Sequence, residues 1–174
     1  IQIFFPAGKV EEKTLEENVN YRELEELGYC IGCGDQTIDY SVIEDYVCGL
    51  EDKYGVFIVG IAYDRYNAIS SAQKWENANY DTVMVRQHSD TLHPPTKLLK
   101  EYVLNGQFQY VKNPLVEINF QNAQCTEDNN RNMYVNKKRS RGKVDAVVSL
   151  INAVYLLQQD LILNPADDWG AQNL

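Results

Sequence analysis

The segment Val56–Ala68, VFIVGIAYDRYNA, decides the fold that we expect for this chain. Its first eight residues, which end at Tyr63, are almost entirely apolar and rich in β-branched and aromatic side chains. A short run of this kind predicts a strand that is buried on both faces of a sheet. Asp64 follows the strand, and Arg65–Asn77 has the sequence pattern of a helix. Because ligands bind outside the carboxyl ends of strands in open α/β sheets, Asp64 occupies a favoured functional position.

The rest of the chain also predicts alternating strands and helices, which argues for an α/β fold built of layers. We expect further strands at Ile1–Phe5, Thr82–Arg86, Phe108–Val111 and Met133–Lys137. We expect helices at Tyr21–Leu27, Val42–Lys53, Thr96–Asn105, Pro114–Ala123 and Lys143–Asp160, with mainly loops at 9–20, 87–93 and 125–132. The core face of the last helix is predicted from apolar residues at helical spacing: Val144, Val147, Val148, Ile151, Val154 and Tyr155.

The totals describe an ordinary globular domain. A chain of 174 residues suits one domain, and its hydrophobic content of 44% and charged content of 24% are typical values. No apolar run is long enough to span a membrane, and the start has no signal-peptide pattern. Because the chain begins IQIFF without a Met, we interpret it as a piece of a longer protein.

Charge is distributed unevenly along the chain. The net charge of −9 argues against nucleic-acid binding over the whole surface, but it leaves room for a local basic patch. Acidic residues concentrate near the start, and no acidic residue lies between Arg131 and Lys143. The basic residues gather in that later part: Arg131, Lys137, Lys138, Arg139, Arg141 and Lys143.

The cysteines and histidines do not form a convincing metal site. Cys30 and Cys33 make one C-x-x-C pair, but no second pair follows at zinc-finger spacing. His88 and His93 are too few and wrongly spaced to complete such a site. We therefore interpret the cysteines as free, buried thiols of a protein in a reducing cytoplasm.

Two aspartates are candidate metal ligands. Asp64 ends the predicted buried strand, and Asp145 lies in the first turn of the last helix. They are 145 − 64 = 81 residues apart, so only the fold could bring them together. Their hard oxygen atoms suit Mg²⁺ or Mn²⁺, and two such ions roughly 4 Å apart can stabilise both oxygens of a phosphodiester displacement. The basic segment before Asp145 would then hold the phosphate backbone of a nucleic acid.

Simpler roles exist for the same residues. Asp64 can cap the helix that starts at Arg65, and Asp145 can satisfy the first-turn amides and the dipole of its own helix. The basic run KKRSRGK is, by itself, more often a solvated loop than a DNA contact. These residues taken alone favour the capping roles.

Several motifs, however, resemble those of one family in order and spacing. AYDRYNA at 62–68 resembles the A-Y-D-R-[WY]-N-A segment in the nuclease domain of tailed-phage terminase large subunits of the HK97-like group. NPLV at 113–116, followed by Asn122, is similar to its N-P-x-[LV] segment, and KVD at 143–145 is similar to its K-[IV]-D. Gln87, Asp128 and Lys137 also fit, and the resemblance covers about residues 1–158. Ala146 and Ile118 depart mildly from the family, which commonly has Gly and Trp there.

This resemblance implies an RNase H-like layered fold, with a central mixed sheet flanked by helices. We expect residues 1–160 to form the nuclease domain and 161–174 a flexible tail. The family's first metal-binding aspartate would lie upstream of Ile1, in a strand ending G-[IL]-D-[LF]-S, and the first two strands would be missing with it. We therefore expect an exposed sheet edge and weak activity of this piece on its own.

The resemblance also implies a function. Family members are metal-dependent endonucleases that cut concatemeric viral DNA by two-metal hydrolysis. Asp64 and Asp145 would be the catalytic metal ligands for Mg²⁺ or Mn²⁺. The implied partners are double-stranded DNA, an ATPase domain in the same polypeptide, the small terminase subunit and the portal protein, with no membrane. The implied location is the host bacterial cytoplasm, transiently at the procapsid portal. The DNA-binding residues would be Lys137, Lys138, Arg139, Arg141 and Lys143.

Two alternatives remain. The first is a non-catalytic module that kept the fold and binds DNA or a portal ring. The second is an unrelated α/β phosphotransfer enzyme. The nuclease interpretation requires the carboxylates of Asp64 and Asp145 to lie within roughly 8 Å of each other, as a metal bridge demands.

Overall fold

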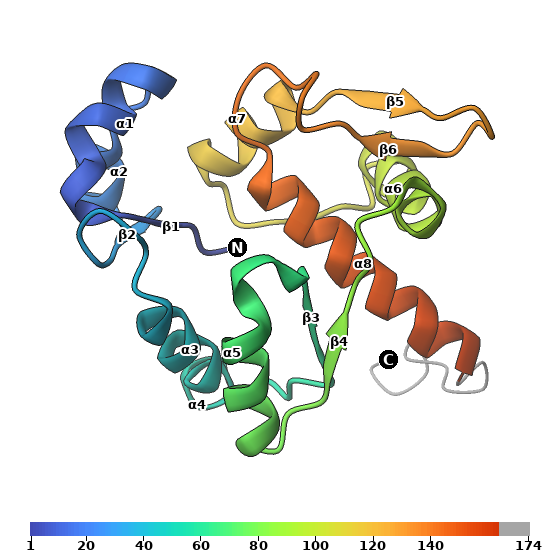
Figure 1. Cartoon of the computed structure of the whole chain (residues 1–174), viewed down its shortest axis with the longest axis horizontal. Helices are drawn as coiled ribbons and strands as arrows, with labels where there is room; N and C mark the ends of the chain where they lie inside the picture. Colours follow the sequence, from blue (N-terminus) through green and yellow to red (C-terminus); the bar gives the residue numbers. More distant parts are fainter. Residues whose placement is uncertain (164–174) are drawn as a thin grey trace.

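The computed structural model describes residues 1–163 of the chain, apart from the side chains of Asn67 and residues 161–163. The predicted tail at 161–174 therefore falls almost entirely outside the described residues. Three groups of elements surround a long C-terminal helix, α8 (Asp145–Leu163), which runs diagonally through the centre of Figure 1. Within the described range, no helix has the length and apolar character needed to cross a membrane.

The three groups follow each other along the sequence (Figure 1). The first contains β1 (Phe4–Phe5), the 3-10 turn η1 (Ala7–Lys9), α1 (Val10–Glu17), α2 (Tyr21–Glu26) and β2 (Ile31–Gly32). The second contains α3 (Tyr40–Cys48), α4 (Leu50–Tyr54), β3 (Ile61–Tyr63), α5 (Arg65–Asn77) and β4 (Thr82–Met84). The third contains α6 (Ser89–Leu104), α7 (Pro114–Asn122), β5 (Cys125–Glu127) and β6 (Met133–Val135), and it leads into α8.

The predicted mixed α/β class is confirmed, but its sheet is divided into small pieces. The described residues form three two-stranded sheets instead of one continuous central sheet. Strands β1 and β2 are parallel, and so are β3 and β4, in which Ala62 pairs with Val83. Strands β5 and β6 form an antiparallel hairpin, which agrees with the strand expected near Met133.

The strand expected over 56–63 is much shorter than predicted and is not buried on both faces. Only Ile61–Tyr63 is extended in a sheet, and its residues are half-buried. The preceding apolar residues face solvent: Val56 is 51% exposed, Phe57 82% and Val59 65%. The physical reason is that, among the described residues, β3 pairs only with β4, so no further strand supports the segment before Ile61. This agrees with the expected exposed edge.

Two apolar clusters form the core. The larger cluster is centred on α8 and joins this helix to β4, α6 and β6. The predicted core face of α8 is confirmed at its fully buried positions. The buried members of the larger cluster are Val85, Leu92, Leu99, Val135, Val144, Val147, Val148 and Ile151. The smaller cluster joins the N-terminal group to α7 through Phe5, Val19, Tyr21, Cys30 and Leu115. Cys30 and Cys33 are free and buried as expected, whereas Cys48 and Cys125 are free but exposed.

Several helices differ from the predicted ranges. Residues 10–17 form a helix where mainly loop was expected, and the helix expected over 42–53 is interrupted at Gly49. No strand forms at 108–111. Helix α6 begins at Ser89 and continues through Pro94 and Pro95, although prolines remove backbone donors inside a helix. The reason is packing, because its buried residues Leu92, Pro95, Thr96 and Leu99 lie at helical spacing.

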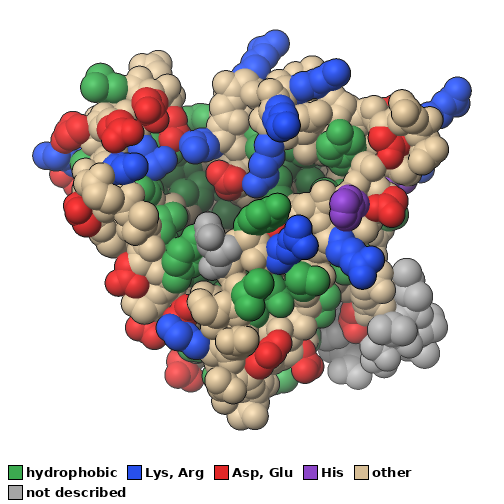
Figure 2. Space-filling view, viewed as in Figure 1, with side chains coloured by type: hydrophobic (Ala, Val, Ile, Leu, Met, Phe, Trp, Pro, Cys, Tyr) green, Lys and Arg blue, Asp and Glu red, His purple; other side chains and the backbone are tan. Residues whose placement is uncertain are grey.

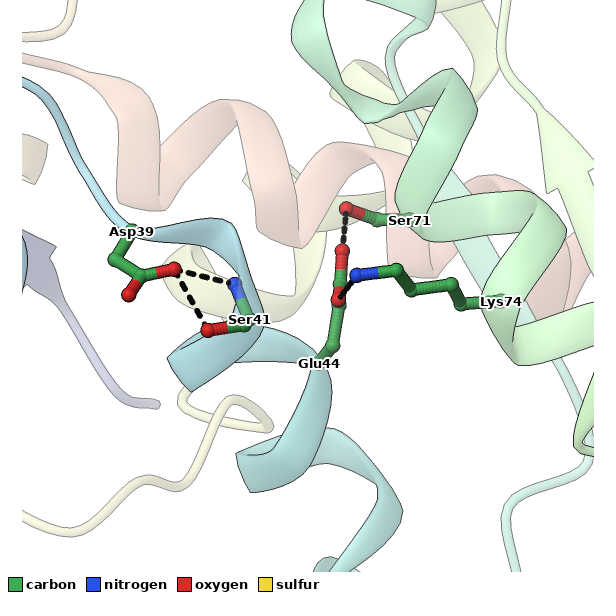
Figure 3. A network of polar contacts seen from close by, with 5 residues as sticks. All are labelled: Asp39, Ser41, Glu44, Ser71 and Lys74. Carbon is green, nitrogen blue, oxygen red and sulfur yellow. Dashed lines mark hydrogen bonds and ion pairs between the residues drawn. The ribbon is translucent and has the colours of Figure 1, made fainter.

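A buried polar network joins α3 to α5 (Figure 3). Glu44 is 6% exposed and accepts hydrogen bonds from the hydroxyl of Ser71, at 2.6 Å, and from the ammonium of Lys74. Burial raises the pKa of Glu44, but the hydrogen bonds from Lys74 and Ser71 outweigh burial and leave that pKa below its ordinary value. A buried carboxylate thus fixes α5, the helix that follows Asp64.

We predict that Ser71→Ala destabilises the fold by about 1.5–3 kcal/mol, because it removes a hydrogen bond to a buried charged group. Urea denaturation measures this free energy of unfolding. The matched control is Ser70→Ala, since Ser70 is exposed and lies next to Ser71 on the same helix. The control is expected to change stability by less than about 0.5 kcal/mol. Equal effects of the two substitutions would contradict the role assigned to this network.

Candidate functional site

Asp64 lies between the carboxyl end of β3 and the first turn of α5. Its Oδ1 accepts a hydrogen bond of 3.3 Å from the backbone N–H of Tyr66, so the capping role is confirmed for this oxygen. The backbone at Asp64 is extended, which is typical of an N-cap residue. Within the described part of the chain, Oδ2 of Asp64 makes no hydrogen bond. One carboxylate oxygen therefore stays available for a ligand.

Asp145 is the first residue of α8, and its side chain is 69% exposed. Its Oδ1 accepts a hydrogen bond of 3.3 Å from the ammonium of Lys137. No backbone amide of its own helix is among its hydrogen-bond donors in residues 1–163; the N–H of Ala146 donates instead to Asn119. The side chain of Asn119, from α7 (Pro114–Asn122), thus caps α8 in place of Asp145, for which this role was the alternative expectation.

The fold brings the two aspartates to one cleft. Asp64 and Asp145 both line a cavity of about 540 Å³, together with Lys137 and Asn152. The cavity is bordered by the N-terminal group, the β3–α5 junction and the first turns of α8. A smaller cavity of about 270 Å³ also joins Asp64 to Lys137, and Gln87 lines it. Two residues that are 81 positions apart in sequence therefore line a common space.

The first group of elements contributes a polar wall that the sequence did not reveal. Glu17 lines the cleft and accepts hydrogen bonds from the hydroxyl of Tyr21, at 2.7 Å, and from the ammonium of Lys13, at 3.3 Å. Burial, the hydrogen bond to Glu17 and nearby negative charges, including that of Asp145, raise the pKa of Tyr21. Tyr21 therefore stays protonated beside the carboxylate of Glu17. The only sequence signal was the i, i+4 spacing of Lys13, Glu17 and Tyr21.

The candidate DNA-binding residues follow β6 and precede α8, and all five are exposed. Lys137, Arg141 and Lys143 line a cavity of about 610 Å³ that Asp145 also lines. Lys138 and Arg139 lie in the turn just after β6 and line neither of the two cavities at Asp145. In Figure 2 basic side chains gather along the upper edge of this face, beside a central hollow, and acidic ones gather over α1 and α2.

A second set of polar contacts fixes the hairpin that carries Lys137. Asp128 accepts hydrogen bonds from the hydroxyl of Ser89, at 2.6 Å, and from the backbone N–H groups of Asn130 and Asn132. Nδ1 of His93 accepts a hydrogen bond of 2.8 Å from the N–H of Met133. The start of α6 thus binds both ends of the β5–β6 turn.

The donor set fits a hydrated divalent cation only in part. Among residues 1–163, no three His, Cys, Asp or Glu side chains form a group that could hold a metal ion. Asp64 and Asp145 nevertheless supply free hard oxygens to one open cleft, and Mg²⁺ in proteins commonly keeps several water ligands beside one or two carboxylates. The two residues therefore fit a cation that keeps much of its water shell.

Comparison with known proteins identifies the family. Residues 2–160 match the family model described as terminase large subunit, endonuclease domain. The chain belongs to this family. The terminase endonuclease domain described here also matches the crystal structure of the HK97 bacteriophage large terminase, with a TM-score of 0.79 and 19% sequence identity.

The match to the HK97 structure covers 88% of the present chain and 32% of the HK97 chain. At this identity the likeness shows a shared fold, and it confirms the RNase H-like class. The terminase endonuclease domain spans about a third of the length of that solved protein. A search among curated proteins gives no match.

We predict that acid weakens the hairpin through Asp128. The hydrogen bonds from Ser89 and Asn132 outweigh desolvation and lower the pKa of Asp128 from 3.8 to about 2. Because this pKa is lower in the folded state, its stabilisation is present above the unfolded pKa and is lost as the pH falls from about 4 to about 2.

The measurement is the melting temperature between pH 2 and pH 5. The variant Asp128→Ala is expected to lose part of the wild-type decrease in this range. The control Glu127→Ala removes an exposed carboxylate of the same hairpin. This variant is expected to keep the wild-type decrease in melting temperature. An unchanged acid profile in Asp128→Ala would rule out this linkage.

Proposed function

We propose that this chain is a metal-dependent DNA endonuclease module of a viral genome-packaging terminase. The observation that carries the proposal is the shared cleft, which Asp64, Asp145 and Lys137 line together although they come from distant parts of the sequence. Membership in the terminase endonuclease family supports the same class of reaction. The expected separation of the two carboxylates, under roughly 8 Å, stays a prediction.

In this proposal, free oxygens of Asp64 and Asp145 would hold Mg²⁺ or Mn²⁺, with two ions in the complete domain. Such ions activate water as a nucleophile and neutralise charge on the phosphate. Asp64 is held in place by its bond to the N–H of Tyr66, which keeps one oxygen on the helix and leaves the other for the ion. The ammonium of Lys137 balances the charge of Asp145 and lies within reach of a bound phosphate group.

The basic loop would bind the DNA backbone beside the cleft. Its exposed side chains are Lys137, Lys138, Arg139, Arg141 and Lys143. Two hydrogen bonds to Asn122 fix the backbone of the loop. The N–H of Arg141 donates to the carbonyl of Asn122, and the side-chain amide of Asn122 donates to the carbonyl of Lys143. Because the backbone of the loop is already fixed, binding of DNA would not cost the conformational entropy of ordering that backbone. The substrate we propose is double-stranded, concatemeric DNA, which is cut by hydrolysis of a phosphodiester.

The further assignments follow from the family. We propose that an ATPase domain in the same polypeptide, the small terminase subunit and the portal protein are partners. We propose action in the host bacterial cytoplasm and transiently at the procapsid portal, by a phage or prophage protein. A second candidate function is a non-catalytic module that binds DNA or the portal. It is favoured because, among residues 1–163, no three His, Cys, Asp or Glu side chains form a group that could hold a metal ion.

We predict that, in the domain completed by its upstream strand, Asp64→Asn and Asp145→Asn each lower Mn²⁺-dependent plasmid nicking about 100-fold or more, because each removes a charged ligand that stabilises the transition state. The assay follows conversion of supercoiled plasmid to open circles. Asp81→Asn is the matched control, since Asp81 is exposed and its carbonyl accepts from Ile61 at the opposite end of β3. Nicking that survives both site substitutions would rule out this mechanism.

We also predict that Arg141→Ala weakens DNA binding in a salt-dependent manner. Loss of one phosphate contact reduces the slope of log K against log salt concentration by about 1. Fluorescence anisotropy at several salt concentrations measures the slope. Lys97→Ala is the control, because Lys97 is an exposed basic residue of α6 that pairs with Glu101 of the same helix. If the slope changes while the wild type shows no Mn²⁺-dependent nicking, the non-catalytic module is the correct function.

A further inference from the structure

Asn119 is a buried polar residue on the apolar side of α7. Its side chain lies beside the fully buried Val116 and Leu115, and the residue is only 7% exposed. A buried asparagine at such a position is unusual, because its amide must find partners inside the protein. The partners of Asn119 therefore indicate why it is there.

Two hydrogen bonds fix the orientation of the Asn119 amide. Its Nδ2 donates to the backbone carbonyl of Leu115 at 2.8 Å, one turn earlier in the same helix. Its Oδ1 accepts from the backbone N–H of Ala146 at 3.1 Å, in the first turn of α8. Because Nδ2 donates to a carbonyl of α7, Oδ1 is the atom that faces α8. Only this orientation of the amide lets Asn119 accept a hydrogen bond from α8.

The bond to Ala146 supplies a cap that α8 lacks in its own sequence. The residue before the helix is Val144, whose carbonyl accepts the first helical bond, from Val148, but whose side chain cannot accept a hydrogen bond. The amides of the first turn need acceptors, and a first-turn aspartate is an available one. Asn119 takes this role for Ala146, so the carboxylate of Asp145 stays in the cleft beside Lys137.

We propose that Asn119 is a positioning residue for Asp145. It caps α8 from the neighbouring helix and thereby keeps the Asp145 carboxylate directed to the cleft for metal binding. The inference rests on the proposed function, since it assigns Asn119 a role in the same site. Asn122, three residues later on α7, supports the same junction, because its Nδ2 donates to the carbonyl of Lys143 at 3.2 Å.

The test compares Asn119→Ala with a closely matched variant, Asn113→Ala. Asn113 lies at the start of the same helix, is 6% exposed and also makes one accepted and one donated backbone bond. Its Oδ1 accepts from Leu115 and its Nδ2 donates to Tyr29, both at 3.0 Å. Asn113 does not line the cleft. The two substitutions are therefore expected to lower the melting temperature by similar amounts.

Mn²⁺ affinity separates the two variants. Titration calorimetry of the 174-residue chain below its melting temperature is expected to show about tenfold weaker Mn²⁺ binding for Asn119→Ala. Asn113→Ala is expected to bind Mn²⁺ as the wild type does. Wild-type affinity in folded Asn119→Ala, or equal weakening in both variants, would overturn the inference.

Two further variants make every outcome decisive. Asn119→Ser keeps a polar group in the buried position, but its side chain is one bond shorter and is therefore expected to weaken Mn²⁺ binding as well. This variant decides the question if Asn119→Ala does not fold. Asp145→Asn tests the underlying site. If Asp145→Asn binds Mn²⁺ as the wild type does, the proposed metal site is wrong. If only Asp145→Asn weakens binding, the site stands and the role of Asn119 is wrong.

Discussion

The packing of the apolar face of α8 is the constraint on which the rest of the structure depends. Val147 and Ile151 of this helix are 3% and 2% exposed, and the cluster around them includes residues of β4, α6 and β6. Burying each such side chain contributes about 1.5–3 kcal/mol. The same packing fixes the start of α8, so the cleft that Asp145 and Asp64 both line is a consequence of core formation.

Local signals predicted much of the fold, and contacts distant in sequence account for what they missed. Helix α5 after Asp64 and the core face of α8 were correct, because a capping residue and an apolar period act within one element. The strand at 56–60 was wrong because a strand needs neighbours, and apolar composition alone does not supply them. The start of α6 was missed because the burial of Leu92 offsets the helix-breaking effect of Pro94 and Pro95.

The candidate site shows the same division. The motifs identified Asp64 and Asp145, and both line one cleft, but the two capping roles had different outcomes. Asp64 caps its own helix, as its place before α5 suggested, whereas the N–H of Ala146 is bound by Asn119. The partner of Ala146 lies 146 − 119 = 27 residues away, so no local pattern could reveal it. Glu17 was missed because its place in the cleft depends on the packing of the N-terminal group, although its spacing from Lys13 and Tyr21 was a local signal.

The pairing of Lys137 with Asp145 is informative because it is energetically weak. Their side chains are 55% and 69% exposed, and an exposed ion pair of this kind contributes only about 0–1 kcal/mol to stability. Its arrangement therefore reflects the electrostatics of the cleft more than the needs of the fold. A carboxylate that stays solvated and is balanced by one exposed ammonium can exchange that ammonium for another cation at little cost. In the proposed function, the Lys137 ammonium would then be released toward the phosphate backbone, on the side of the cleft where the basic loop lies.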